Sequence, residues 1–123
     1  TTLIYAGQEF ENDHLPSLFE KEPIDRNTGK DLSALMARLR QIKGMFGGDD
    51  WFRAEGDSEQ DIAVLRRGNR EHRFLGVFSL KSDRGEVALD LADGSYEDLI
   101  DGEMVEIRGG KIRCEGRPII IKE

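Results

Sequence analysis

The sequence of 123 residues predicts a mostly β protein: an antiparallel Greek-key-type β-sandwich preceded by one strand and one amphipathic helix. Three observations carry this prediction. From residue 51 onward, short segments alternate apolar and polar residues, as half-buried strands do. Glycine-containing pairs typical of tight turns separate these segments. Residues 31–43 instead place their apolar side chains at helical spacing.

Residues 3–9 have the pattern of a strand that ends at a polar tip. The apolar run Leu3-Ile4-Tyr5 is followed by Ala6-Gly7-Gln8-Glu9, as in a buried parallel strand whose carboxyl end faces a ligand. Because such a strand stands here without a preceding neighbour, we expect the chain to be the C-terminal piece of a larger protein. The strand is expected to pair with an edge of the sandwich or of a second chain.

A loop and a helix are expected next. Residues 10–29 are acidic and contain Pro16, Pro23 and an Asn27-Thr28-Gly29 turn. The helix predicted over residues 31–43 can be capped by Thr28 or Asp31 and ended by Gly44. Its apolar stripe consists of Leu32, Leu35, Met36, Leu39 and Ile42.

The break at residues 47–50 (Gly-Gly-Asp-Asp) divides the chain into two predicted domains, 1–46 and 47–123. Strands are predicted in the second domain over residues 51–54, 63–67, 73–80, 86–91, 96–99, 104–108, 111–114 and 118–122. The predicted turns contain residues 68–69, 83–85, 93–94, 101–102 and 109–110. The order of the strands cannot be read from these patterns.

Two segments resemble a known family. Residues 2–9 (Thr-Leu-Ile-Tyr-Ala-Gly-Gln-Glu) and the loop behind them, with Leu18-Phe19 and Pro23-Ile24-Asp25, resemble the eighth barrel strand and following loop of the α-amylase superfamily of glycoside hydrolases. Arg26 stands where that family usually has Trp. Residues 91–103, which contain Asp93-Gly94 and Tyr96, resemble a hairpin of the family's C-terminal β-sandwich. In this order, and with a helix and a run of strands between them, the two matches cover most of the chain.

The resemblance implies both an architecture and a function. Residues 1–46 would be the last strand, active-site loop and helix of a (β/α)8 barrel, and residues 47–123 the C-terminal β-sandwich domain. The parent enzyme would cleave α-glucosidic bonds of α-glucans and maltodextrins with a carboxylate nucleophile and a carboxylic acid/base. Those catalytic residues lie upstream in the family, so this chain alone is expected to be non-catalytic. Gln8 and Glu9 would orient groups beside the substrate cleft.

An acidic row in the loop suggests a catalytic pair, which we reject. Glu9 and Glu11 would lie about 7 Å apart on one side of a strand, near the separation of glycosidase carboxylates. However, residues 10–16 have the composition of a loop, and a surface row such as Glu9, Glu11 and Asp13 is usually solvated.

No metal site or cofactor is expected in this chain. His14 and His72 are the two histidines and have no paired-ligand spacing. No calcium-binding Asp-x-Asp-x-Asp-Gly loop occurs, although the resemblance allows calcium in the parent. Cys114, the one cysteine, is expected to be buried and inert. A single cysteine leaves the compartment open and mildly favours the cytosol.

The composition argues against two classes of partner. The chain has 18 Lys and Arg against 25 Asp and Glu, a net charge of -7, so it lacks the basic excess of nucleic-acid binding proteins. No apolar run approaches the roughly 20 residues that span a bilayer. Neither nucleic acid nor a membrane is an expected partner.

Two alternatives to the hydrolase interpretation remain. The sandwich could be a carbohydrate-binding module, for which Trp51, Phe52 and Tyr96 are the aromatic candidates, although core or interdomain packing of Trp51 is favoured. The low aromatic content, 7%, counts against this module. Alternatively, the chain could be an interaction domain that forms a homodimer through Leu35, Leu39 and Ile42 of the helix.

Overall fold

The computed structural model describes residues 3–15, 17, 19–47 and 50–123, which form two compact units. Unit 1 comprises Thr1–Lys43 and unit 2 comprises Gly44–Glu123. The sequence predicted the division after Phe46. Parts of the predicted motifs, namely residues 1–2, 16, 18, 48 and 49, lie outside the described residues.

The strand predicted over residues 3–8 is absent from the described part of unit 1. Residues 3–5 have no regular structure, and Gln8–Phe10 form a short 3-10 helix, η1. Gly7 precedes it with φ 97°, a left-handed conformation that favours glycine. The prediction was wrong because an apolar run becomes a strand only when another strand accepts its backbone hydrogen bonds, and all strands paired in the described residues belong to unit 2.

The predicted helix is present as α1, Ser33–Gly44. Asp31 begins it, because its Oδ1 accepts a hydrogen bond from the Ser33 amide at 2.8 Å. Thr28 does not cap the helix; its hydroxyl donates to the Phe10 carbonyl. In the apolar stripe Ile42 is buried, Leu32, Leu35 and Met36 are half-buried, and Leu39 is exposed.

In its described residues, unit 2 contains eight strands that overlap the eight predicted ones, with the fourth and fifth each beginning two residues earlier than predicted. They are β1 (Trp51–Asp57), β2 (Ile62–Gly68), β3 (Arg73–Ser79), β4 (Arg84–Ala88), β5 (Gly94–Glu97), β6 (Met104–Arg108), β7 (Lys111–Glu115) and β8 (Ile119–Lys122). Three predicted turns overlap strands: Gly68 ends β2, Gly94 begins β5, and Arg84 and Gly85 already belong to β4. The turn before β4 lies over residues 80–83 instead.

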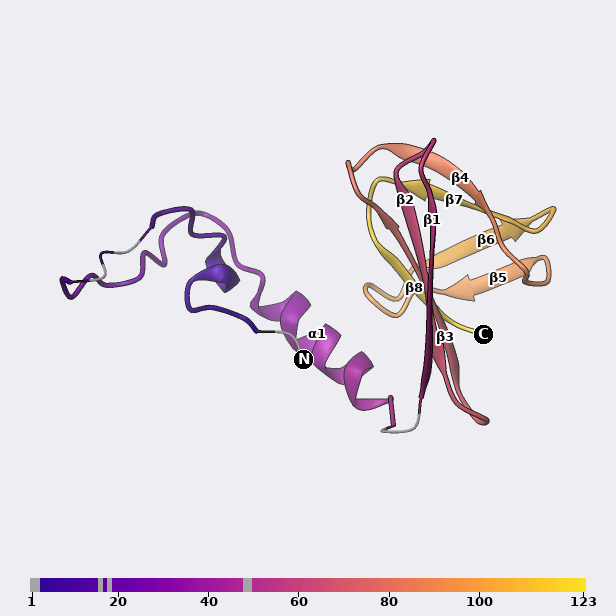
Figure 1. Cartoon of the computed structure of the whole chain (residues 1–123), viewed down its shortest axis with the longest axis horizontal. Coiled ribbons are helices and arrows are strands. Elements are labelled where there is room, and N and C mark those ends of the chain that lie inside the picture. Colours follow the sequence, from indigo (N-terminus) through magenta and orange to yellow (C-terminus); the bar gives the residue numbers. More distant parts are fainter. Residues whose placement is uncertain (1–2, 16, 18, 48–49) are drawn as a thin grey trace. The chain divides into compact units, whose positions relative to one another are not determined.

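The strands form a sandwich of two four-stranded antiparallel sheets (Figure 1), in the orders β1-β2-β3-β8 (sheet A) and β4-β7-β6-β5 (sheet B). Sheet B is a Greek key, because β5, β6 and β7 are consecutive hairpins and β4 lies beside β7. The chain crosses between the sheets twice, from β3 to β4 and from β7 to β8. This confirms the predicted fold class.

The hydrophobic core lies between the sheets and follows the strand alternation. Sheet A contributes Ile62, Val64, Leu75, Val77, Ile119 and Ile121. Sheet B and the residue that follows β4 contribute Val87, Leu89, Ile107, Ile112 and Cys114. Cross-strand pairs such as Val64–Val77 and Leu75–Ile121 place these side chains on one face. Cys114 is fully buried, as predicted, and its thiol lies 3.5 Å from the Arg117 carbonyl oxygen.

Asp93 anchors the β6–β7 turn to the connection between β4 and β5. Its two carboxylate oxygens each accept a backbone hydrogen bond at 2.8 Å, one from Gly109 and one from Gly110. These bonds, that of Gly110 first, lower the pKa of Asp93 below its ordinary value of 3.8. The charged carboxylate is therefore the form that the folded state prefers.

A pH dependence follows. A carboxyl group whose pKa is lower in the folded state stabilises the fold fully above its unfolded pKa, and this contribution disappears as the pH falls below 3.8 through the folded pKa. The Asp93→Asn variant is therefore expected to lose less stability than the unchanged protein between about pH 5 and pH 2.5. Urea unfolding at both pH values measures this. Asp90→Asn, an exposed carboxylate in the same connection, is the control; an equal reduction in both variants would contradict the assignment.

Candidate functional surfaces

Gln8 and Glu9, the predicted cleft residues, both fold back onto their own backbone. Gln8 Oε1 accepts a hydrogen bond from the Tyr5 amide at 2.7 Å, and Glu9 Oε2 accepts one from the Gly7 amide at 2.9 Å. The Glu9 carbonyl also accepts the Leu32 amide at 2.7 Å, which ties η1 to the start of α1. In unit 1, both side chains thus hold the turn at Gly7.

The acidic loop residues form local ion pairs. Glu11 pairs with Lys30, whose pKa is raised by this contact. His14 Nε2 lies 3.1 Å from Glu22 Oε2; a hydrogen bond from the Ser17 amide and then this imidazole lower the pKa of Glu22. Within residues 3–15, 17, 19–47 and 50–123, no group of three or more His, Cys, Asp or Glu side chains could hold a metal ion. None of the helices formed by these residues has an apolar stretch that could span a bilayer.

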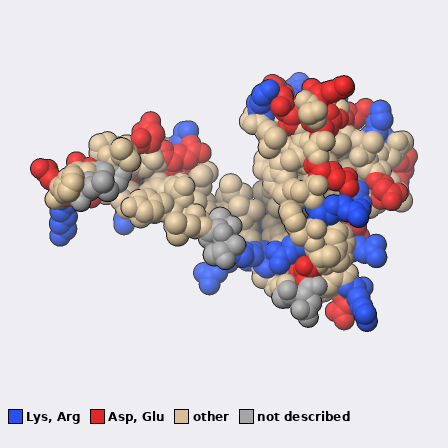
Figure 2. Space-filling model, viewed as in Figure 1, with Lys and Arg blue, Asp and Glu red and all other residues tan. Residues whose placement is uncertain are grey.

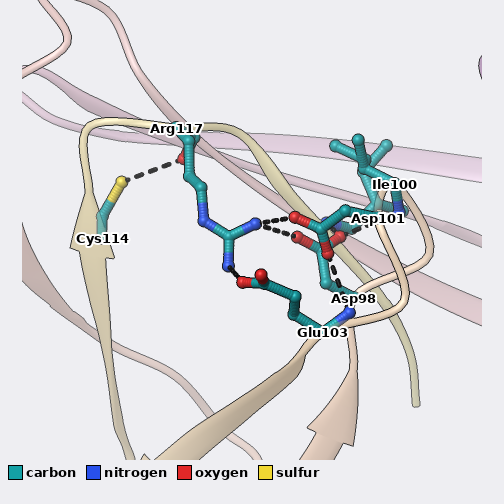
Figure 3. Close-up of polar contacts among 7 residues, drawn as sticks. Asp98, Ile100, Asp101, Glu103, Cys114 and Arg117 are labelled. Atoms are coloured by element: carbon teal, nitrogen blue, oxygen red, sulfur yellow. Dashed lines mark hydrogen bonds and ion pairs between the residues drawn. The ribbon is translucent and has the colours of Figure 1, made fainter. Parts of the chain in front are cut away.

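Arg117, between β7 and β8, joins three carboxylates (Figure 3). Its guanidinium contacts Asp98 Oδ2 at 3.4 Å, Glu103 Oε2 at 2.9 Å and the carboxylate of Asp101. Asp98 is fully buried, and its Oδ1 accepts the amides of Ile100 and Ile120, each at 3.0 Å. Because every partner is already used within the fold, this cluster is a structural clamp between the β5–β6 loop and β8.

This clamp was not predicted from the sequence, although the sequence contains a signal for it. Asp98 is the second Asp of the Asp-Gly-x-Tyr-x-Asp-Leu phrase at residues 93–99, which was interpreted only as a hairpin. An Asp beside Leu99 at the end of a half-buried strand is a candidate for burial with a basic partner. The sequence does not indicate which arginine this is. The crossing from β7 to β8 decides it by placing Arg117 beside Asp98.

The outer face of sheet A, away from the core, is also apolar. It carries Phe46, Phe52, Leu65, Phe74, Phe78 and Ile120, which line a hollow of about 190 Å³ together with Arg67 and Gly76. Phe46 packs edge-on against Phe74, with ring centroids 4.8 Å apart, and the Arg67 guanidinium lies 4.3 Å above the Phe46 ring. Phe52 remains 63% exposed.

This outer face was also missed, and the signal was the continuous apolar run. Phe74-Leu75-Gly76-Val77-Phe78 and Ile119-Ile120-Ile121 do not alternate with polar residues, which is typical of strands covered on both faces. Phe74 is 3% exposed, and apart from Phe52 the other large side chains of this face are half-buried. The part around Phe52 is therefore the part open for another segment of a protein to pack against.

The aromatic residues predicted as candidates for sugar binding differ in their burial in the structure. Tyr96 packs against the core, and its hydroxyl donates to the Ala92 carbonyl at 2.9 Å. Core packing, one of the two alternatives favoured for Trp51, is wrong: the indole is 43% exposed and lies beside an open cleft of about 780 Å³. Interdomain packing of Trp51 stays a prediction. Because β1 is the edge strand of sheet A and is mostly exposed, sheet B does not cover this end of it.

The charged side chains of unit 2 do not form a field of one sign. On the face shown in Figure 2, acidic and basic side chains of unit 2 are interspersed with one another, both at its edges and in its middle. Ion pairs such as Arg84–Glu115 and Lys111–Glu86 connect neighbouring strands of sheet B. Long-range electrostatic steering of a strongly charged partner is therefore not supported by this face.

Comparisons with known proteins agree with this fold. Residues 53–121, within unit 2, match the family described as the bacterial α-amylase C-terminal domain. The crystal structure of an α-amylase from Lactobacillus plantarum superimposes with a TM-score of 0.82 and 29% identity over 98% of this chain and 29% of that chain. An Anoxybacillus α-amylase shares the fold, with a TM-score of 0.59 and 15% identity over 80% of this chain and 24% of its own.

The matches cover most of this chain but only a small part of each α-amylase. The chain spans less than a third of the length of either α-amylase structure, and no curated protein matches the sequence. The matched family segment covers more than half of the chain and contains most of both sheets. The chain therefore belongs to the bacterial α-amylase C-terminal domain family.

Proposed function

We propose that this chain is the C-terminal portion of an α-amylase-type glycoside hydrolase that acts on α-glucans and maltodextrins, and that the chain itself is structural and non-catalytic. The observation that carries the proposal is the similarity of 98% of the chain, unit 1 included, to part of a longer α-amylase. A glycosidase needs two carboxyl groups aimed at one bond. Glu9 is instead hydrogen-bonded to the Gly7 amide, and Glu11 is paired with Lys30.

The outer face of sheet A supports a role as a supporting domain. Strands β3 and β8 are apolar on both faces, but the core covers only one of them. Burial of the second face, which includes the exposed Phe52 ring, would stabilise an assembly by the hydrophobic effect. In the proposed enzyme, this face packs against the catalytic part of the same polypeptide.

A hydrolysis assay on maltoheptaose tests the proposal. The chain of 123 residues and the full-length gene product are assayed side by side at equal molar concentration. We expect reducing ends to appear only with the full-length protein. Hydrolysis by the chain itself would overturn its non-catalytic role and direct attention back to Glu9 and Glu11. A full-length protein without activity on maltoheptaose or starch would overturn the hydrolase proposal.

A further inference from the structure

The cleft beside Trp51 has the form of a binding site. It has a volume of about 780 Å³ and lies entirely in unit 2, with Asp50, Trp51, Asn69, Arg70, Glu71 and Arg73 among the residues that line it. Trp51 is the first residue of β1, and Asn69, Arg70 and Glu71 belong to the β2–β3 turn. The cleft thus combines one large apolar ring with several polar side chains, which is the usual composition of a small-molecule site.

The register of the sheet explains why the indole is left open. Trp51 pairs with Gly68, so its cross-strand neighbour has no side chain to lie against it. A larger residue is excluded there, because a Cβ at position 68 would lie 2.5 Å from the His72 carbonyl oxygen. Trp51 shares its sheet face with the core residue Val64 by alternation, yet it lies beyond the reach of the core and is 43% exposed.

One wall of the cleft is rigid. Asn69 Nδ2 donates to Asp50 Oδ1 at 3.0 Å, and Asn69 Oδ1 accepts the amides of Glu71 and His72 at 2.8 and 2.9 Å. The side chain of Asp50 is 2% exposed and also contacts Arg67 Nε at 3.4 Å. These contacts hold the turn next to the indole in one conformation, so binding there would not require the wall to be ordered first.

Other polar side chains of the cleft are available to hydrogen-bond to a ligand. Among the residues that the structure describes, none forms an ion pair or a side-chain hydrogen bond with the side chains of Arg70, Glu71 or Arg73. Guanidinium groups offer hydrogen-bond donors and the carboxylate offers acceptors. Beside an exposed indole, this combination suits a ring with an apolar C–H face and hydroxyl groups at its edge.

We propose that the Trp51 cleft is a binding site for α-glucan chains, in which the indole stacks on a glucose ring and Arg70 and Glu71 hydrogen-bond to its hydroxyl groups. The choice of α-glucan rests on the proposed function, whereas the cleft itself rests on the geometry above. The site holds the polymer without reacting with it.

Trp51 is the one tryptophan of the chain, so tryptophan fluorescence reports on this site alone. Titration of the whole chain with maltoheptaose is expected to change the emission in a saturable way and to reduce its quenching by acrylamide. Glu71→Gln is expected to weaken binding about fivefold or more, and Glu106→Gln, an exposed carboxylate on β6, to leave it unchanged. Trp51→Ala is expected to abolish binding measured by calorimetry, with circular dichroism as the check that the variant folds.

Several outcomes would overturn the site. One is an emission that does not respond to maltoheptaose up to about 10 mM; another is equal weakening by Glu71→Gln and Glu106→Gln. A response to inorganic phosphate instead of the sugar would show an anion site, and an equal response to cellohexaose would remove the α-glucan assignment.

If the full-length protein hydrolyses maltoheptaose while Trp51 does not respond, the cleft proposal alone fails. If Trp51 responds but the full-length protein is inactive, the hydrolase proposal fails and a sugar-binding module remains.

Discussion

Replacing Asp98 with alanine is expected to lower the free energy of unfolding of the protein by about 3–5 kcal/mol, the range found when one partner of a buried ion pair is removed. The carboxylate is fully buried, and the Ile100 and Ile120 amides donate to it. Without it, these two buried amides lose their acceptor, and the Arg117 guanidinium loses one of its three carboxylate partners. The loss approaches the whole stability of a small domain, which is of order 0.05–0.15 kcal/mol per residue.

Urea unfolding followed by circular dichroism measures this effect. Asp101→Ala is the matched control, because Asp101 contacts the same guanidinium from an exposed position and is expected to cost at most about 1 kcal/mol. Asp98→Asn keeps one acceptor oxygen and is expected to fall between the two, which provides a measurable variant if Asp98→Ala does not fold. Equal effects of Asp98→Ala and Asp101→Ala would contradict the clamp.

The bend at Gly116 is expected to tolerate no side chain. Gly116 has φ 87°, and a Cβ there would lie 2.4 Å from the Ser82 carbonyl oxygen. Ser82 lies in the crossing from β3 to β4 and Gly116 in the crossing from β7 to β8, so the two segments that connect the sheets approach each other at this point. Because both atoms in conflict are tied to backbone, Gly116→Ala must displace one of the crossings.

Gly109→Ala separates this steric conflict from the cost of the backbone conformation. Gly109 also has positive φ, 59°, but nothing lies within 4 Å of a Cβ built there. Its alanine variant is expected to lose only the left-handed penalty of about 1–2 kcal/mol. Gly116→Ala is expected to lose about 1–3 kcal/mol more, as measured by thermal or urea unfolding. A Gly116→Ala loss no larger than that of Gly109→Ala would show that the two crossings can move apart without cost.

The sequence alone determined the elements of unit 2. Alternation, the apolar runs of β3 and β8 and the turn residues between segments indicated all eight strands, because side-chain period and the preference of Gly, Asn and Asp for turns act within a few residues. A helix over residues 31–43 was predicted for the same reason, from one apolar stripe and a cap at Thr28 or Asp31; the observed helix is Ser33–Gly44 and its cap is Asp31. The two short segments that resemble the α-amylase superfamily also indicated the family to which the chain belongs.

Only the tertiary structure decided what depends on residues far apart in the chain. The apolar run at residues 3–5 is not a strand, because a strand exists only where a neighbour pairs with its backbone. Alternation gives the face of a side chain but not whether another sheet covers that face, so it could not place Trp51 outside the core or bury Asp98. The pairing of Arg117 with Asp98 and the opening of the Trp51 cleft both follow from strand order and register, which no local pattern encodes.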